Sequence, residues 1–476
     1  MASRFGDEFN AFGLVPLVQN TPFKITALAS YNDHIYVGTK DGRVVVFRNV
    51  PGSAELLSAR LHRSKPVTTL LLAGPLQRVL ALCGGKIYVL DLYTLQHSKA
   101  IETAINKRVR GATVFCIDRA GPPLWRLCFG VKRKLVLFEY SGAEWSFLKE
   151  LALPESASAM CWFGPSICVG YKREYNIIKV DTGQTIKAGP VLDNGDEPYL
   201  KVLPGPHIIA GGMAEVGVLL DLRGNPTSGV VGWSGNINSS VYTYPYLASL
   251  VQTKATDKGD AEGGDGDGGG SGAAAAAAGL VGGLFGGGGS SKSLGSRVIE
   301  VHSVIDQYKL VQTIQVPPDA VTLVDCSDHL SPTAATSASH QNERARRSSL
   351  RASRAPRSGP GSTPMMSAAA RTTSQLFFAS TTAIYQINMI AIPKQVSQLL
   401  QSVRVEAALN LLKATTPLEP MVQRERVLAQ FSQDAGVTLF VNLMFKDATP
   451  HLCASYMDLR ELLQLFPELQ PIGGIG

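Results

Sequence analysis

Short apolar runs that fold back on themselves recur along this chain. In the first, residues 34–48 (HIYVGTKDGRVVVFR), the runs 35–38 and 44–47 flank the turn 40–42. Asp-Gly between two β-branched runs predicts a β-hairpin, because a tight turn needs residues that tolerate positive φ. Similar hairpins begin at residues 78, 125, 166, 207, 246 and 375. The first six starts are 39 to 47 residues apart, which is the period of a β-propeller blade.

These seven repeats predict an all-β, seven-bladed β-propeller over residues 12–392. Strand patterns precede each hairpin and follow most of them, including residues 95–101 as the outer strand of the second blade. The seventh hairpin has no strand behind it, whereas residues 12–18 (FGLVPLV) are a spare strand at the other end of the chain. We expect the spare strand to complete the seventh blade, which removes two exposed edges. Pro16 suits an outermost strand, where its missing donor can face solvent.

Two long insertions interrupt the repeats, at residues 253–296 and 331–374. Both are rich in Gly, Ser, Ala or Pro and poor in aromatic residues, so neither can bury a core and both are expected to be disordered. Residues 273–289 are mostly Ala and Gly, which is too short and too weakly apolar for a membrane span. Because successive strand connections alternate between the two faces of a propeller, the insertions are expected to leave from opposite faces.

From residue 393 the apolar period becomes helical. Val396, Leu399, Leu400 and Val403 begin an apolar stripe, and residues 422–431, 437–445 and 459–466 predict further helices. Short helices with brief connections indicate that residues 393–470 are the start of an α-solenoid, of the kind built from clathrin-heavy-chain-like repeats. No polar capping repeat follows, so we expect an apolar end.

Composition narrows the class of partner. The formal net charge is +7, but residues 341–374 alone hold seven Arg against one Glu, so the rest of the chain is nearly neutral. This argues against nucleic-acid binding, which needs a dense basic footprint. The cysteines are scattered, without a C-x-x-C pair, and indicate buried, reduced thiols in a cytosolic protein. They are Cys83, Cys116, Cys128, Cys161, Cys168, Cys326 and Cys453. The N-terminus has no apolar signal region.

The search for catalytic chemistry is negative. GDGDGGG neither follows a strand nor opens a helix, Asp265 and Asp267 lack the later Glu of a calcium loop, and the eight His have no metal-ligand spacing. We therefore expect no cofactor, no metal and no enzyme. A propeller enzyme stays open as an alternative, because distant residues converge at a propeller's central channel.

Two features suggest binding or regulation. The hairpin turns of the first four blades carry cations that would project from one face of the ring, namely Lys40, Arg43, Lys86, Lys132, Arg133, Lys134, Lys172 and Arg173. These eight residues, here called the basic rim, are either solvated turn residues or a site for an acidic protein surface or anionic lipid headgroups. The second feature is Ser349 in RRSSL, which has the form of a basic-directed kinase site.

Several strings together resemble a known family. VGTKDGRVVVF, CGGKIYVLDL, VKRKLVLF and SICVGYKREYNIIKVD, followed by AIPKQVSQLLQ and EAALNLL, look like a citron-homology (CNH) domain. More narrowly, they resemble the Vam six / Vps thirty-nine subunits of HOPS tethering complexes, over residues 12–463 without the two insertions. The tail motif FKDATPHLCASYMDLREL is part of this resemblance.

The resemblance implies a non-catalytic scaffold in the cytoplasm, peripheral on late endosomes and the vacuole or lysosome. It would help to tether late endosomes, autophagosomes and vacuoles before fusion, through a late-endosomal Rab GTPase and sister HOPS-type subunits. The related early-endosomal CORVET subunit, similar to the TGF-β-receptor-associated protein, is the alternative, because both share this architecture. The two insertions, and the lack of the long helical region and Cys-rich end of full-length members, depart from the family pattern.

Overall fold

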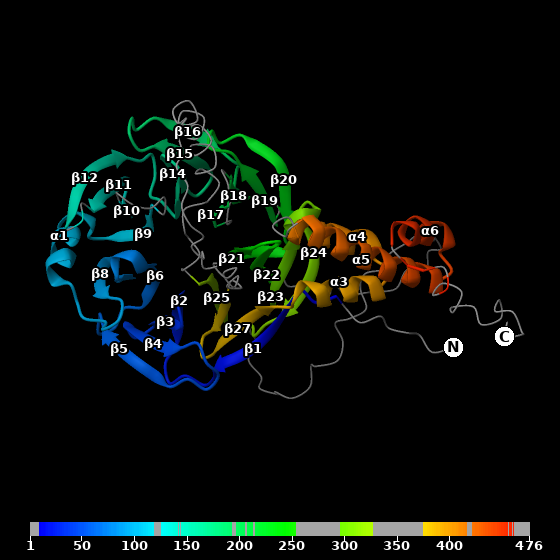
Figure 1. Cartoon of the computed structure of the whole chain (residues 1–476). Coiled ribbons are helices and arrows are strands. Elements are labelled where there is room, and N and C mark those ends of the chain that lie inside the picture. Colours follow the sequence, from blue (N-terminus) through cyan, green and yellow to red (C-terminus); the bar gives the residue numbers. More distant parts are fainter. Residues whose placement is uncertain are drawn as a thin grey trace, which may run out of the picture.

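Seven antiparallel sheets stand around a central axis in a computed structural model of the chain (Figure 1). The structure describes residues 9–118, 125–140, 142, 144–192, 197–204, 207–212, 215–253, 296–326, 375–416, 421–455, 457–458 and 460. The architecture is the expected seven-bladed β-propeller, followed by four helices among the described residues. The 253–296 insertion, apart from its two end residues, and the 331–374 insertion lie outside the described residues, as do Ser349 and the helix expected at 459–466, apart from Arg460.

Within each blade the strands follow one another outward from the axis. The innermost strands are β2 (Ile25–Tyr31), β6 (Val67–Ala73), β9 (Ala112–Ile117), β13 (Ala159–Phe163), β17 (Tyr199–Leu203), β21 (Gly235–Thr243) and β25 (Ala320–Asp325). The second strands are β3 (His34–Thr39), β7 (Arg78–Cys83), β10 (Trp125–Val131), β14 (Ser166–Gly170), β18 (His207–Gly212), β22 (Tyr246–Thr253) and β26 (Leu376–Ser380).

The outer half of each blade is more varied. The third strands are β4 (Arg43–Arg48), β8 (Lys86–Asp91), β11 (Lys134–Tyr140), β15 (Tyr175–Lys179), β19 (Val216–Leu220), β23 (Arg297–Ser303) and β27 (Ile384–Met389). The outermost strands are β5 (Glu55–Arg60), β12 (Trp145–Ala152), β16 (Thr185–Ala188), β20 (Pro226–Gly232), β24 (Lys309–Gln315) and, for the seventh blade, β1 (Phe12–Val18).

The ring closes as expected from the spare strand. β1 pairs antiparallel with β27, in the order β1-β27-β26-β25. Its inward side chains Phe12 and Leu17 are buried, while Val15 faces outward. The seventh blade therefore combines both ends of the propeller sequence.

The outer strand expected at 95–101 in the second blade is wrong. β6, β7 and β8 form a three-stranded sheet, and helix α1 (Lys99–Val109) lies where the fourth strand would be. The reason is visible in the side chains, because Ile105 and Val109 are spaced to face the core and are buried. Ile101, Ile105 and Val109 follow the four-residue spacing of a helix, and this pattern continues beyond residues 95–101, where the strand was expected.

Helix α1 also satisfies the open edge of β8. Asn106 Oδ1 accepts from the Ile87 N–H at 3.0 Å and Asn106 Nδ2 donates to the Ile87 carbonyl at 2.6 Å. One turn earlier, Glu102 Oε1 accepts from the Val89 N–H at 3.0 Å. Side chains four apart on a helix thus meet backbone groups two apart on a strand, so the edge is paired without a fourth strand.

The hydrophobic core lies between neighbouring blades. Leu80 and Val89 of the second blade pack with Phe115 and Phe129 of the third, for example. Polar side chains join the inner strands as well, since Thr26 Oγ1 donates to the Val67 carbonyl at 2.7 Å. Each blade is therefore held by its neighbours rather than by a core of its own.

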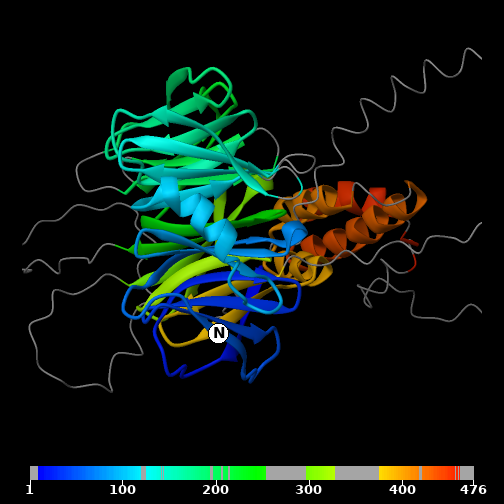
Figure 2. The same ribbon diagram turned by 90° about the vertical axis from the view of Figure 1, so that its left-hand side faces the viewer.

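The helices pack on blades six and seven. They are α3 (Ile392–Gln401), α4 (Val405–Thr415), α5 (Met421–Val441) and α6 (Phe445–Ala454). Residues 422–441 form one helix, so the expected break between 431 and 437 is wrong; Phe431, Ala435 and Leu439 continue a buried stripe through it. In Figure 2 the helices stand on one side of the ring.

The joint between propeller and helices is polar as well as apolar. Gln395 of α3 is fully buried; its Oε1 accepts a hydrogen bond from the Tyr246 hydroxyl, and its Nε2 donates to the Ile390 carbonyl at 2.6 Å. Tyr244 Oη donates to the Ala414 carbonyl at 3.0 Å. These bonds fix α3 and α4 against the sixth blade.

Candidate interaction surface

A backbone hydrogen bond recurs at one end of the first five blades. After the outer element of each blade, a backbone N–H donates to a carbonyl in or beside the turn between that blade's second and third strands. The pairs are Leu61 to Gly42, Gly111 to Gly85, Leu153 to Arg133, Leu192 to Arg173 and Trp233 to Glu215, at 2.7 to 3.0 Å. The hairpin turns and the connections between blades therefore lie side by side on one face of the ring.

The basic rim lies on this face. Lys40, Lys86, Lys132, Arg133, Lys172 and Arg173 are exposed, and Arg43 and Lys134 are half-buried. The strand order brings the four turns to the same end of consecutive blades, as the sequence indicated. What the rim binds stays a prediction.

The structure adds six cations that the sequence reading missed. The end of β5 contributes Arg60, the connection from it to the second blade contributes Arg63 and Lys65, and the end of α1 with its C-cap residue contributes Lys107, Arg108 and Arg110. All six are exposed or half-exposed at the rim's end of the ring. The basic rim and these six residues together are here called the basic face. A connection between blades lies at the same end of the ring as the hairpin turns. Cations in these connections could therefore have been assigned to the same face from the sequence.

Neighbouring parts of the basic face touch through the backbone. A Cβ at Gly42 would meet the His62 carbonyl oxygen at 2.6 Å and that of Lys65 at 2.7 Å, and φ at Gly42 is +82°. Glycine therefore lets the first turn lie directly on the following connection. A Cβ at Gly84 would meet the Lys65 side chain at 3.1 Å, so the same connection also reaches the second turn.

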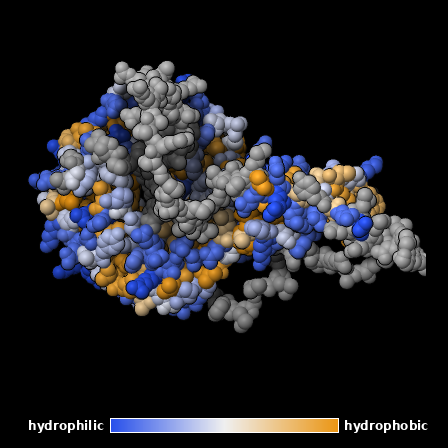
Figure 3. Space-filling model, in the orientation of Figure 1, coloured by the Kyte–Doolittle hydropathy of each residue, from blue (hydrophilic) through white to orange (hydrophobic). Residues whose placement is uncertain are grey.

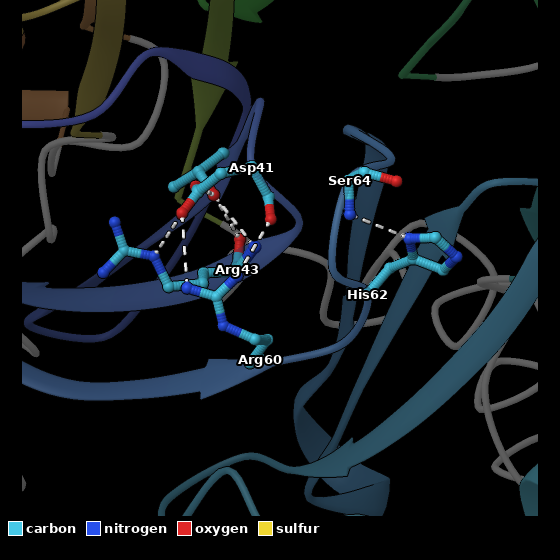
Figure 4. A network of polar contacts seen from close by, with 6 residues as sticks. Asp41, Arg43, Arg60, His62 and Ser64 are labelled. Atoms are coloured by element: carbon cyan, nitrogen blue, oxygen red, sulfur yellow. Dashed lines mark hydrogen bonds and ion pairs between the residues drawn. The ribbon is translucent and has the colours of Figure 1, made fainter.

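Some of the cations are neutralised locally. Asp41 Oδ2 lies 2.8 Å from Arg43 Nε and 3.7 Å from Arg60 (Figure 4). Partial burial opposes ionisation of Asp41, but the Thr39 hydrogen bond and the Arg43 guanidinium outweigh it and lower the pKa of the carboxyl. Arg43 thus braces its own hairpin.

A second acidic side chain lies beside the third blade's turn. Glu150 of β12 pairs with Lys134 at 2.8 Å and lies 3.9 Å from Arg108 of α1, whose guanidinium covers the Phe147 ring at 3.9 Å. The lysines at 40, 86, 132 and 172 and the arginine at 133 extend instead from exposed turns.

Charge is divided between the two ends of blades one to four. At the basic end, the described residues 40–43, 60–66, 84–86, 107–111, 132–134, 153–158 and 171–174 hold fourteen Lys or Arg against three acidic residues. At the other end, the described residues 32–33, 48–54, 74–78, 91–98, 118, 142, 144, 164–165 and 179–184 hold three against five. The cations are therefore gathered on one face rather than scattered.

The helices leave from the other end. Tyr244, which bonds α4, lies in the turn between the first and second strands of blade six, and α4 lies against the turn Val304–Asp306 between β23 and β24. Both turns are at the end opposite the basic face. No described helix or strand beyond the propeller covers that face.

Other classes of site find little support in the described ranges. No three His, Cys, Asp or Glu side chains gather there as metal ligands would. Six cysteines are buried and Cys453 is exposed, all as free thiols. Of the described helices, none has both the length and the apolar character needed to cross a membrane.

The helical segment has exposed apolar side chains. Val441, Leu443, Met444 and Phe445, around the turn between α5 and α6, are 66%, 75%, 41% and 48% exposed. Figure 3 shows hydrophobic surface on this segment among polar residues. The apolar end expected after these helices lies outside the described residues and stays a prediction.

Comparisons with known proteins find one matching domain family and several relatives. The CNH domain family matches residues 31–257. The chain is 23% identical to the zebrafish (Danio rerio) transforming growth factor-beta receptor-associated protein 1 homolog, over 97% of this chain and 45% of that protein. It is 27% identical to the human Vam6/Vps39-like protein, over 51% of this chain and 29% of that protein.

Two further similarities extend the comparison. The Arabidopsis thaliana vacuolar sorting protein 39 is 26% identical over 51% of this chain and 24% of that protein. A solved structure, the AfRom2 CNH domain, has a TM-score of 0.45 and 12% identity, covering 80% of this chain and 99% of that one. The match spans less than half the length of each of these curated relatives. The chain thus contains a CNH domain, at residues 31–257, within its seven-bladed propeller.

Proposed function

We propose that this chain is a non-catalytic scaffold subunit of a vesicle-tethering complex that acts between endosomes and the vacuole or lysosome. The observation that carries the proposal is the similarity to vacuolar sorting proteins of the Vps39 kind, which covers 51% of this chain. In this proposal the propeller occupies residues 12–392 and residues 393–470 begin an α-solenoid. The protein is cytoplasmic and peripheral on late-endosomal or vacuolar membranes.

The proposed partners are sister subunits of a HOPS-type complex and a GTP-loaded late-endosomal Rab GTPase. Repeat folds suit such a role, because they present extended surfaces held by a rigid frame. The basic face supplies one such surface, and the exposed turn between α5 and α6 supplies another. Phosphorylation of Ser349 would add roughly −1.5 to −2 charge to an Arg-rich segment.

A second assignment rests on its own observation. The similarity to the transforming growth factor-beta receptor-associated protein 1 homolog spans 97% of this chain, nearly twice the share covered by the Vps39-like match. That similarity favours an early-endosomal, CORVET-type subunit.

Affinity purification of the tagged chain from cells, followed by mass spectrometry, tests the proposal. Co-purification of tethering subunits together with late-endosomal Rab supports the HOPS-type assignment. The same subunits with an early-endosomal Rab support the CORVET type. Absence of tethering subunits from the purified material, at a bait abundance that recovers a known tether in parallel, would overturn both.

A further inference from the structure

Among the described residues, the basic face is continuous and no helix or strand outside the propeller covers it. Its fourteen cations come from four consecutive blades, and the repeated backbone bonds join each turn to the following connection. The described helices leave from the opposite end, so a large partner can approach without displacing any described element. A cavity lined by Phe9, Tyr246 and Leu411, among others, lies at the helical joint and not among these cations.

The residue types of the basic face indicate the class of partner. Protein interface cores are enriched in aromatic residues and depleted in Lys. Seven of the fourteen cations that form this face are Lys, and none of the exposed large hydrophobic side chains of the described residues lies in the seven segments that form it. A bilayer surface needs neither shape complementarity nor an apolar anchor, since juxtamembrane cations are attracted by the surface potential of anionic lipids.

The charge is also one-sided within this end of the ring. On blades five to seven, the described turns and connections 19–24, 189–192, 197–198, 215, 233–235, 253, 296–297, 316–319 and 381–383 hold two cations, Lys24 and Arg297, against three acidic residues. An anionic plane therefore attracts blades one to four and not the opposite side. The ring would meet such a plane tilted onto blades one to four.

We propose that the basic face docks this protein on the anionic cytoplasmic leaflet of a membrane. The tilt places blades one to four at the headgroups and directs the helices, which leave from the other end, away from the bilayer. The proposal rests on the proposed function for the identity of the membrane, and it assigns the lipid contact to residues of this chain. Each contact is an exposed charge, so binding comes from the sum and falls as salt screens it.

The test uses the full chain and vesicles of phosphatidylcholine with or without phosphatidylserine, in co-sedimentation at two NaCl concentrations. One variant reverses one cation from each of blades one to four, counting the connection that follows a blade as part of it: Arg63→Glu, Lys107→Glu, Arg133→Glu and Lys172→Glu. The matched control reverses four exposed cations elsewhere, Arg48→Glu, Lys179→Glu, Arg223→Glu and Lys309→Glu. Both variants have the same net charge, and thermal unfolding checks that both are folded.

We expect the wild type to bind only phosphatidylserine vesicles, and more weakly at the higher salt concentration. The basic-face variant should bind at least about a hundredfold more weakly, while the control stays within about threefold of the wild type. Equal loss in both variants, or no preference of the wild type for anionic vesicles, would overturn the proposal. The proposal would also be overturned if the basic-face variant bound vesicles as the wild type does but no longer bound an acidic protein partner. Co-purification of tethering subunits is measured separately. A failure of vesicle binding can therefore be distinguished from a failure of the proposed function.

Discussion

Pro16 of β1 lies directly opposite Tyr385 of β27, across the seam that joins the two ends of the propeller sequence. The pairing shifts register between Pro16 and Val18, where Leu17 turns inward and is 2% exposed. Proline lacks an N–H donor and is tolerated on an outermost strand. At the seam, Pro16 therefore suits the solvent-facing edge of β1, while Leu17 packs into the core.

Deletion of residues 1–20 removes β1 and is expected to destabilise the whole ring. It exposes the edge of β27 and uncovers the core beneath Phe12 and Leu17, so thermal unfolding should occur at a clearly lower temperature, with aggregation. Differential scanning fluorimetry and size-exclusion chromatography measure both effects. A deletion of residues 1–8 is the control. An unchanged melting temperature with monodisperse behaviour after the longer deletion would contradict the closure.

The edge of the second blade supports a second prediction. Asn106→Ala leaves the Ile87 N–H and carbonyl without their helical partner, and should lower the free energy of unfolding by about 1–3 kcal/mol. Thr103→Ala, on the exposed side of α1, is the matched control and should change it by less than about 0.5 kcal/mol. Urea denaturation gives both values. Equal effects of the two substitutions would show that the edge bonds contribute nothing.

The joint between propeller and helices supports a third. Burial raises the pKa of Tyr246, so its hydroxyl stays protonated and donates to Gln395. Tyr246→Phe leaves that buried amide oxygen without the donor and should destabilise the protein by about 1–3 kcal/mol. Tyr244→Phe removes an exposed bond to Ala414 and should cost less. Hydrogen exchange of α3 amides, faster in the first variant than in the second, locates the effect at the joint.

We expect the buried side chain of His302 to make the stability of the protein depend on pH. Burial lowers the pKa of His302, against the opposing effects of Glu300 at 3.9 Å and the Gly232 carbonyl at 2.9 Å. Because the folded pKa lies below the unfolded value of about 6.5, the unfolded state takes up a proton first as pH falls. Stability should therefore decrease below about pH 6.5. Urea denaturation between pH 7.5 and 5.5 should show a shallower decrease for His302→Gln than for wild type or His62→Gln. Identical slopes would contradict the assignment to His302.

Local patterns in the sequence were enough to predict the ring and its closure. Period-two runs with Asp-Gly or similar turns specify hairpins, and residues 12–18 could be matched to the blade that lacked a strand. α1 was misread because residues 95–101 look like a strand in a short window, whereas the helical spacing of Ile101, Ile105 and Val109 extends beyond it. The length of α5 was missed for the opposite reason, since polar residues at 432–434 look like a connection but lie between buried Phe431 and Ala435.

The candidate surface was predictable only in part. Hairpin turns repeat, so the basic rim could be found by comparing blades. Arg60 ends β5, and Arg63 and Lys65 lie in the connection that follows it, so the repeated hairpin turns do not mark them. Lys107, Arg108 and Arg110 lie at or just after the end of α1, where no helix is expected from the sequence, so their position depends on the path of that helix. The bracing of Arg43 by Asp41 likewise depends on side-chain geometry that spacing alone does not give.

We propose that this chain recognises an endosomal Rab as a subunit of a tether. The most direct measurement is binding of the purified full chain to late-endosomal and early-endosomal Rab proteins, each loaded with a GTP analogue or with GDP, by biolayer interferometry. We expect the chain to bind one of these Rab proteins at least about tenfold more tightly in the GTP-like state than in the GDP state, a difference of about 1.4 kcal/mol. Binding to neither Rab, or equal binding in both nucleotide states, would contradict it.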